Sequence, residues 1–129
     1  MEKQLTIQKH DSSERQTTMK HCSTKILAVR DALEIFSGKW KIPIIGALIY
    51  LEEAGFKDLQ RMVGDITPKM LSKELKELEI NLLIKRTVLD TRPVTVKYSI
   101  TEYGKTCQSV IFELYHWGEQ HRKRIKEGM

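Results

Sequence analysis

TPKMLSKELKELEIN, residues 67–81, predicts the helix around which the rest of the chain is organised. Leu71, Leu75 and Leu78 recur at positions i, i+4 and i+7, so one face of this helix is apolar. The opposite face carries polar and basic side chains and one methionine: Lys69, Met70, Ser72, Lys73 and Lys76. Taken alone, the stretch is more typical of an ordinary amphipathic helix with a solvated outer face.

A turn and a shorter helix precede residues 67–81. Thr67 is suited to cap the later helix, because its hydroxyl can accept an unpaired backbone N–H. Pro68 fits the first helical position, where its missing donor costs nothing. Upstream, Phe56–Val63 predicts a short helix, and Gly64-Asp65 marks a turn. Two short helices joined by a three- or four-residue turn that contains glycine are typical of a helix-turn-helix.

Two strands follow residues 67–81. Ile84–Leu89 is rich in branched residues, and residues 94–100 alternate apolar and polar side chains, which predicts a half-buried strand. Asp90, Thr91, Arg92 and Pro93 form the tip of the hairpin between them. Residues 85–97 hold four basic side chains (Lys85, Arg86, Arg92 and Lys97) against the single carboxylate of Asp90. The helix-turn-helix is therefore followed by a short basic hairpin, or wing.

The N-terminal part of the chain predicts an arm and two helices. Residues 1–20 are polar, with little apolar periodicity and nearly balanced charge, so we expect a flexible arm. Ser23 or Thr24 can cap a helix that runs to about Phe36 and carries two adjacent apolar stripes. Such a helix needs partners on more than one side, and in a small domain one partner is a second subunit. The apolar segment 39–51 predicts a core helix that starts at Lys41 or Ile42, because Pro43 is tolerated only in the first turn.

The C-terminal part predicts one long helix. Thr101 is its expected cap, and the apolar stripe continues through Tyr103, Cys107, Val110, Ile111, Leu114 and Trp117. Basic residues close the chain, which suits the negative end of the helix dipole. The predicted fold is mainly α with a small β-hairpin (α+β): a winged helix-turn-helix with extra N- and C-terminal dimerisation helices. It would occupy residues 21–129, after the arm of residues 1–20.

Length, charge and cysteine content limit the class of protein. The chain has 129 residues, a formal net charge of +5 and 30% charged residues. A length of this kind fits one domain with a real core. The positive charge makes a polyanionic partner reasonable without requiring one. Two cysteines are too few for a disulfide scaffold, and neither a membrane span nor a signal peptide is recognisable. We expect a soluble, cytoplasmic protein without a membrane partner.

The winged pattern predicts which residues contact double-stranded DNA. In such folds the second helix of the turn motif enters the major groove with its N-terminal half nearest the bases. The residues expected at DNA are Thr67, Pro68, Lys69, Met70, Ser72, Lys73, Lys76, Lys57, Arg92 and Lys97. Lysines can donate to guanine, Met70 can touch a thymine methyl, and Arg92 suits the narrow minor groove. Lys57, Lys76, Lys39 and Lys41 are candidate phosphate contacts.

Catalysis fits this sequence poorly. His116 and His121 are five positions apart, about 140° around a helix, so they cannot share a metal as an i, i+4 pair could. Cys22 and Cys107 lack metal-ligand spacing, and no glycine-rich phosphate loop is present. We expect no catalytic residue, no metal and no cofactor.

Five ordered blocks give the sequence a family resemblance: SGKWK at 37–41, FKDLQR at 56–61, ITPKMLSKELKELE at 66–79, PVTVKYSITEYG at 93–104 and WGEQH at 117–121. Together they resemble the HxlR-type family of bacterial winged-helix transcriptional regulators. The resemblance implies a homodimer on a pseudo-palindromic operator, and repression is the more common outcome. It places the dimer interface on the first and last helices, at Ile26, Val29, Leu33, Val110, Ile111, Leu114 and Trp117.

Two residues depart from the family pattern. Members of the family often carry a cysteine shortly before the GKW block, and in some it senses oxidants or electrophiles. Cys22 lies eighteen positions before Trp40, which is more distant than that spacing, so its redox role is an open hypothesis. Leu82 stands near the end of the recognition helix, where the family usually has glycine. We therefore expect Asn81 to supply the left-handed cap.

Two alternatives from other classes remain open at this point. One is a winged helix that contacts an acidic protein partner through its basic wing. The other is a redox-sensing regulator, or a thiol enzyme, that depends on Cys22. The operator, the regulated genes and the effector are not legible in the sequence.

Overall fold

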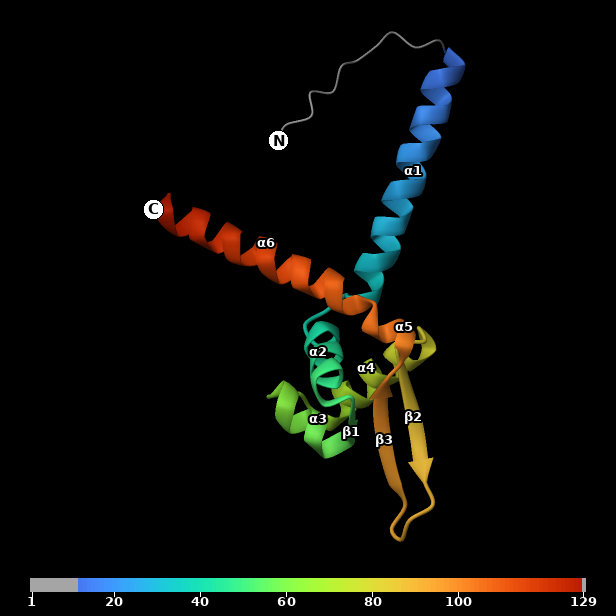
Figure 1. Cartoon of the computed structure of the whole chain (residues 1–129), viewed down its shortest axis with the longest axis vertical. Coiled ribbons are helices and arrows are strands. Elements are labelled where there is room, and N and C mark those ends of the chain that lie inside the picture. The colour runs from blue at the N-terminus through green and yellow to red at the C-terminus, as the bar shows by residue number, and fades with distance from the viewer. Residues whose placement is uncertain (1–11, 129) are drawn as a thin grey trace. The chain divides into compact units, whose positions relative to one another are not determined.

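The computed structural model describes residues 12–128, and it describes side chains from residue 21 onward. The chain divides after Glu34 into two compact units. The described part of the first unit is helix α1, whose bounds are Ser12–Ile35. The second unit begins at Ile35 and contains all the other elements (Figure 1).

Helix α1 begins earlier than the sequence predicts. Its first residue is Ser12 rather than Ser23 or Thr24, so residues 12–20, which the sequence assigns to a flexible arm, belong to the helix. Residues 1–11 lie outside the described part. The polar segment 12–20 includes glutamate, arginine, glutamine, methionine and lysine, which are good helix formers. An apolar stripe is therefore not needed for this stretch to be helical.

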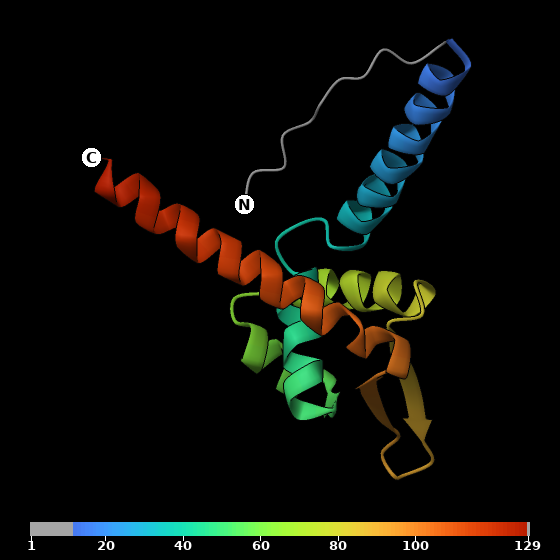
Figure 2. The ribbon, with the colours of Figure 1, turned by 45° about the horizontal axis from the view of Figure 1, so that its top comes forward.

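The second unit contains five helices and three strands in its described residues (Figure 2). In chain order they are α2 Lys41–Leu51, β1 Glu53–Gly55, α3 Phe56–Val63, α4 Pro68–Ile80, β2 Ile84–Leu89, β3 Thr95–Ile100, α5 Glu102–Lys105 and α6 Cys107–Glu127. This confirms the prediction of a mainly helical winged helix-turn-helix, in which α3 and α4 form the turn motif and β2 and β3 form the wing. None of the described helices is long and apolar enough to cross a membrane.

Helix α2 is the central element of the core. It begins at Lys41, as expected from Pro43 in its first turn. Ile44, Ile45 and Leu48 are completely buried on it. The leucine face of α4 packs into the same core, since Leu71, Leu75 and Leu78 are also fully buried with Leu59 of α3 and Leu83. The apolar face predicted for residues 67–81 is thereby confirmed.

Strand β1 was not predicted from the sequence. It has only three residues, Glu53–Gly55, and it follows Glu52, whose φ of 67° lies in the left-handed region. The sheet order is β1–β3–β2, with both pairs antiparallel. Ala54 lies opposite Tyr98 and is buried. A segment this short gives no period-2 pattern, so the sequence indicates only a break in the chain there.

Helix α4 ends through Leu82, not Asn81 as expected. The φ of Asn81 is −84°, whereas the φ of Leu82 is 66°. The backbone N–H of Leu83 donates to the carbonyl of Leu78 at 3.1 Å, and that of Leu82 donates to Glu79 at 3.0 Å. This is the Schellman arrangement, and it is completed by contact between apolar residues on both sides of the turn. Leu83 and Leu78 are both buried, so burial of Leu83 holds Leu82 in its unusual conformation.

The predicted long final helix is interrupted. Thr101 caps α5 as expected, because its hydroxyl accepts from the Gly104 N–H at 2.8 Å. The helix breaks at Thr106 and continues as α6. The Thr101 hydroxyl also lies 2.8 Å from the Leu82 carbonyl, to which it can donate. A Cβ at Gly104 would overlap the Leu83 carbonyl oxygen, so only glycine allows α5 to approach the end of α4.

Candidate nucleic-acid interface

Helix α4 presents a stripe of lysines opposite its buried leucines. Lys69, Lys73 and Lys76 repeat the i, i+4, i+7 spacing of Leu71, Leu75 and Leu78, two residues earlier. Two residues correspond to about 200° around a helix, so the lysines lie on the opposite face. All three are exposed, as is Ser72 on the same side of the helix. This exposed face is the natural candidate for a polyanion.

Lys41 removes two carboxylates from that face. The side chain of Lys41 is only 7% exposed, and its ammonium lies 2.8 Å from a Glu74 carboxylate oxygen and 2.5 Å from one of Glu77. Lys41 is therefore not a phosphate contact, which corrects the sequence expectation. It joins the first residue of α2 to the middle of α4. The two glutamates point away from the outer face, as expected.

The pairing changes two pKa values in a consistent way. Burial alone would lower the pKa of Lys41, but hydrogen bonds and charge attraction to Glu74 and Glu77 outweigh it and raise that pKa above 10.5. The hydrogen bond from Lys41 lowers the pKa of Glu77 below 4.5, and the positive charges of Lys41 and Lys73 act in the same direction. Both groups therefore stay ionised at neutral pH.

The other predicted contact residues of the turn motif differ in exposure. Lys57, at the start of α3, is exposed. Pro68 and Thr67 are exposed too, and the Thr67 hydroxyl accepts from the Met70 N–H at 3.2 Å as the α4 cap. Met70 itself is half-buried and packs against the core. Less of its side chain is therefore available to a thymine methyl than the sequence suggests.

The wing extends beyond the helices of the turn motif and carries Arg92 at its exposed tip (Figure 1). The tip is braced by the Thr91 hydroxyl, which lies 2.8 Å from the Pro93 carbonyl and 2.8 Å from the Thr95 hydroxyl. Lys97 is half-buried, because β3 is the central strand of the sheet. It pairs with Thr87 across the ladder.

Sequence reasoning did not assign a role to the groove between α4 and the wing. This α4–wing groove has a volume of about 410 Å³ and is lined by Ser72, Leu75, Lys76, Glu79, Arg86 and Tyr98. Arg86 and Tyr98 are cross-strand partners and so share one face of the sheet. Buried Ile84 lies two residues before Arg86, and that spacing is the signal that places Arg86 on the helix-facing side.

Comparison with known proteins identifies the family. The model of the HxlR-like helix-turn-helix family matches residues 35–126, which is most of the chain and covers α2 through nearly all of α6. The chain belongs to the HxlR-like family. Within this family match lie the turn motif, the lysine face and the wing.

Related proteins give the same assignment. The HTH-type transcriptional regulator YtcD of Bacillus subtilis is 34% identical over 99 residues, covering 77% of this chain and 78% of the relative. The redox regulator HypR in its reduced form superimposes with a TM-score of 0.70 at 31% identity, over 78% of this chain and 98% of that one. The reduced transcriptional regulator YodB from B. subtilis gives 0.65 at 35% identity, over 70% and 88%. This HxlR-like chain is therefore an HTH-type, DNA-binding transcriptional regulator, in a family of regulators rather than enzymes.

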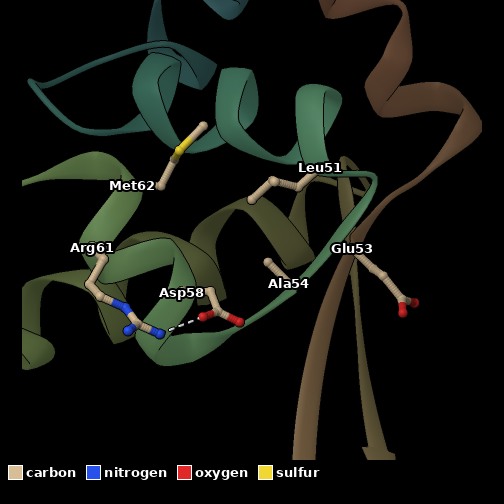
Figure 3. A pocket seen from close by; sticks show the side chains of 6 residues that line it. All are labelled: Leu51, Glu53, Ala54, Asp58, Arg61 and Met62. Carbon is tan, nitrogen blue, oxygen red and sulfur yellow. Dashed lines mark hydrogen bonds and ion pairs between the residues drawn. The ribbon is translucent and has the colours of Figure 1, made fainter.

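Two further hollows lie among the described residues of the second unit. One, of about 420 Å³, lies between α2, β1 and α3 and is lined by Leu51, Glu53, Ala54, Asp58, Arg61 and Met62 (Figure 3). Arg61 donates to Asp58 at 2.6 Å, so its charge is already paired there. A second hollow beside Lys57 runs along the turn of the helix-turn-helix to Gly64 and Asp65.

The two cysteines differ in their surroundings. Cys22 is exposed on α1, and Cys107 is buried at the start of α6, where burial raises the pKa of its thiol. His121 stacks on Trp117 and His116 stacks on Phe112, with ring centroids 5.0 Å and 6.4 Å apart. Among residues 21–128, whose side chains the structure describes, no group of three or more His, Cys, Asp or Glu could hold a metal ion.

Proposed function

We propose that the chain acts as a homodimer that binds a pseudo-palindromic operator in double-stranded DNA and, in the usual case, represses a nearby promoter. Helix α4 enters the major groove and the wing tip, residues 90–93, reaches the adjacent minor groove. One observation carries the proposal: the exposed lysine stripe of α4 stands opposite a fully buried leucine face and beside a basic wing. A solvated helix would need no basic wing next to it.

Bases are read by the first half of α4. Lys69, Lys73 and Ser72 are exposed there and can donate to base edges, with lysine suited to guanine O6 and N7. Lys76, further along α4, and Lys57, at the start of α3, meet phosphates, which adds affinity but no sequence information. Arg92, at the wing tip, fits the enhanced negative potential of a narrow minor groove.

Exposed apolar side chains on α1 and α6 support the homodimer. On α1, Ile26, Val29 and Leu33 are each more than half exposed, and Leu33 reaches 63%. On α6, Val110, Leu114 and Trp117 are exposed, with Trp117 at 68%. Ile111 is half-buried against the core of its own chain, so it contributes less to the interface. Apolar stripes of this extent are unfavourable in water and suit a second copy of the chain.

Replacement of one lysine that is proposed to enter the DNA major groove tests the proposal. Lys73→Ala should weaken binding to DNA from upstream of the chain's own gene by about tenfold, because a donor to a base edge is removed. Fluorescence anisotropy at matched salt measures the affinity. Lys105→Ala is the control, since Lys105 is an exposed lysine on α5 that pairs with Glu102 and carries the same charge. Equal affinity of the Lys73 variant and the unaltered folded protein would contradict base reading by α4.

Redox sensing through Cys22 is a second candidate. Its thiol is exposed on α1, one of the two helices proposed for dimerisation, and two related structures are a redox regulator and a diamide-treated regulator. Peroxide, hypochlorite or quinone treatment should then change operator binding of the unaltered chain but not of Cys22→Ser. Unchanged operator binding after treatment would contradict redox sensing through Cys22 without affecting the proposal of DNA binding.

A winged helix that contacts an acidic protein partner is the remaining alternative. It differs from the main proposal in one inexpensive measurement, retention on random-sequence duplex DNA. Retention that falls steeply with salt favours phosphate contacts, because bound cations displace condensed counterions. Absence of retention at low salt would favour the protein partner.

A further inference from the structure

We propose that the α4–wing groove binds the sugar–phosphate backbone of the DNA. One strand would lie between the wing and α4 and contact Arg86 and Tyr98 on one side and Ser72 and Lys76 on the other. The inference rests on the proposed function. It adds a second class of contact, on the helix-facing side of the sheet, that recognises phosphate rather than bases.

The geometry of duplex DNA calls for such a groove. The major groove and the next minor groove are separated by a single sugar–phosphate backbone. A protein that places α4 in one groove and the wing tip in the other must let that backbone pass between the two elements. The α4–wing groove is the hollow between them, and Leu75 forms part of its floor. Its position therefore follows from the two insertions.

The groove carries the chemistry for an anion. Lys76 of α4 and Arg86 of β2 both line it, and Ser72 and Tyr98 are hydroxyl-bearing residues of the same lining. Both cations are exposed, and neither has an ion-pair partner among the described residues. A guanidinium is well matched to phosphate, because its planar fork can donate two parallel hydrogen bonds.

Glu79 is the one lining residue of the opposite sign. It lies half-buried on the α4 wall, about one turn beyond Lys76 and two turns beyond Ser72. Its carboxylate repels a phosphate in the groove and lowers the affinity that the two cations would otherwise provide. The groove therefore predicts two effects of opposite direction, loss of affinity without Arg86 and gain of affinity without Glu79.

The strand itself offers a matched control for Arg86. Lys85 is the preceding residue and is also exposed, but successive side chains on a strand point to opposite faces. Lys85 pairs with Ser99, whereas Arg86 pairs with Tyr98, so Lys85 lies on the face away from α4. The two variants Arg86→Met and Lys85→Met remove the same charge from neighbouring positions.

Fluorescence-anisotropy titrations of the full-length protein test the inference. They use two duplex DNAs, one of random sequence and one from upstream of the chain's own gene (the upstream fragment). Arg86→Met should weaken binding to both DNAs by a similar factor, about tenfold, because phosphate contacts carry no sequence information. The slope of log affinity against log salt should become shallower by roughly one unit for each phosphate that the variant no longer neutralises. Lys85→Met, on the face away from α4, should change both quantities much less than Arg86→Met does, and thermal unfolding confirms that each variant is folded.

Glu79→Gln should tighten binding to both DNAs by roughly two- to fivefold, a gain that a purely structural role would not produce. Arg86→Met with unaltered affinity and salt slope, beside a weakened Lys73→Ala, would overturn this inference and leave the proposed function standing. Weakening confined to the upstream fragment would also overturn it, because Arg86 would then read bases. Absence of salt-dependent binding by the unaltered chain would overturn both.

Discussion

At the scale of single residues, Lys41 shows how a charge predicted for DNA can serve the fold. Its sequence context, beside Trp40 and Lys39, gives no sign of a buried partner. The partner residues lie more than thirty positions later, on α4, and only the packing of α4 against α2 brings them to the Lys41 ammonium. A long-range ion pair of this kind cannot be predicted from periodicity.

Removal of the Lys41 charge should destabilise the folded chain. Lys41→Ala leaves the carboxylate of Glu74 buried and uncompensated, which is expected to lower the free energy of unfolding by about 3–5 kcal/mol. Urea denaturation at pH 7 measures the loss. The double variant Lys41→Met with Glu74→Met serves as control, because an apolar replacement of both partners is close to neutral. A loss below about 0.5 kcal/mol in the single variant would show that the pair is not structural.

The ion pair between Lys41 and Glu77 gives the expected dependence of stability on pH. The pKa of Glu77 is lowered in the folded chain, so its contribution is present above its ordinary value of 4.5 and is lost as pH falls through the folded value. The pKa of Lys41 is raised, so its contribution is present below 10.5 and is lost as pH rises through the folded value. The difference between the unaltered chain and Lys41→Ala should therefore be nearly constant between these limits and shrink outside them.

At the scale of elements, the sequence predicts what periodic patterns can carry. The bounds of α3, the cap and leucine face of α4 and both bounds of β2 agree with the structure, because each has an apolar repeat or a clear cap. Three features without such a signal differ: the start of α1, the existence of β1 and the break before α6. In the α4–wing groove, the exposure of Lys76 was predictable from the helical repeat, whereas the place of Arg86 depends on which face of the strand its side chain occupies as well as on its charge.

The cap at the end of α4 is another feature that the sequence did not predict correctly, and its energetic cost can be measured. Leu82 holds a left-handed backbone conformation that costs a non-glycine residue about 1–2 kcal/mol, and its side chain is exposed. Leu82→Gly should therefore raise the free energy of unfolding, by roughly 0.5–1 kcal/mol after the greater entropy of glycine in the unfolded chain is included. Urea denaturation measures the change, and Ile80→Gly is a contrasting variant that should destabilise α4. A stability decrease in Leu82→Gly would indicate that the leucine side chain matters more than the backbone.

At the scale of the whole molecule, the basic surfaces and the exposed apolar surfaces lie on different elements and have different proposed partners. The lysine face of α4 and the wing form one candidate surface, and the exposed stripes of α1 and α6 form others. The first serves DNA in our proposal and the others serve a second copy of the chain. Two-fold pairing would place two α4 helices about one helical turn of DNA apart, ~34 Å, and would require two related half-sites in the operator.

Hydroxyl-radical footprinting of the full-length protein on DNA upstream of its own gene distinguishes a two-fold dimer on an operator from other modes of DNA binding. We expect two protected half-sites related by two-fold symmetry, with centres separated by about one helical turn, ~34 Å, and weakened protection of both in Lys73→Ala. Protection of an unsymmetrical site, or uniform protection without a preferred position by folded protein at moderate salt, would contradict it.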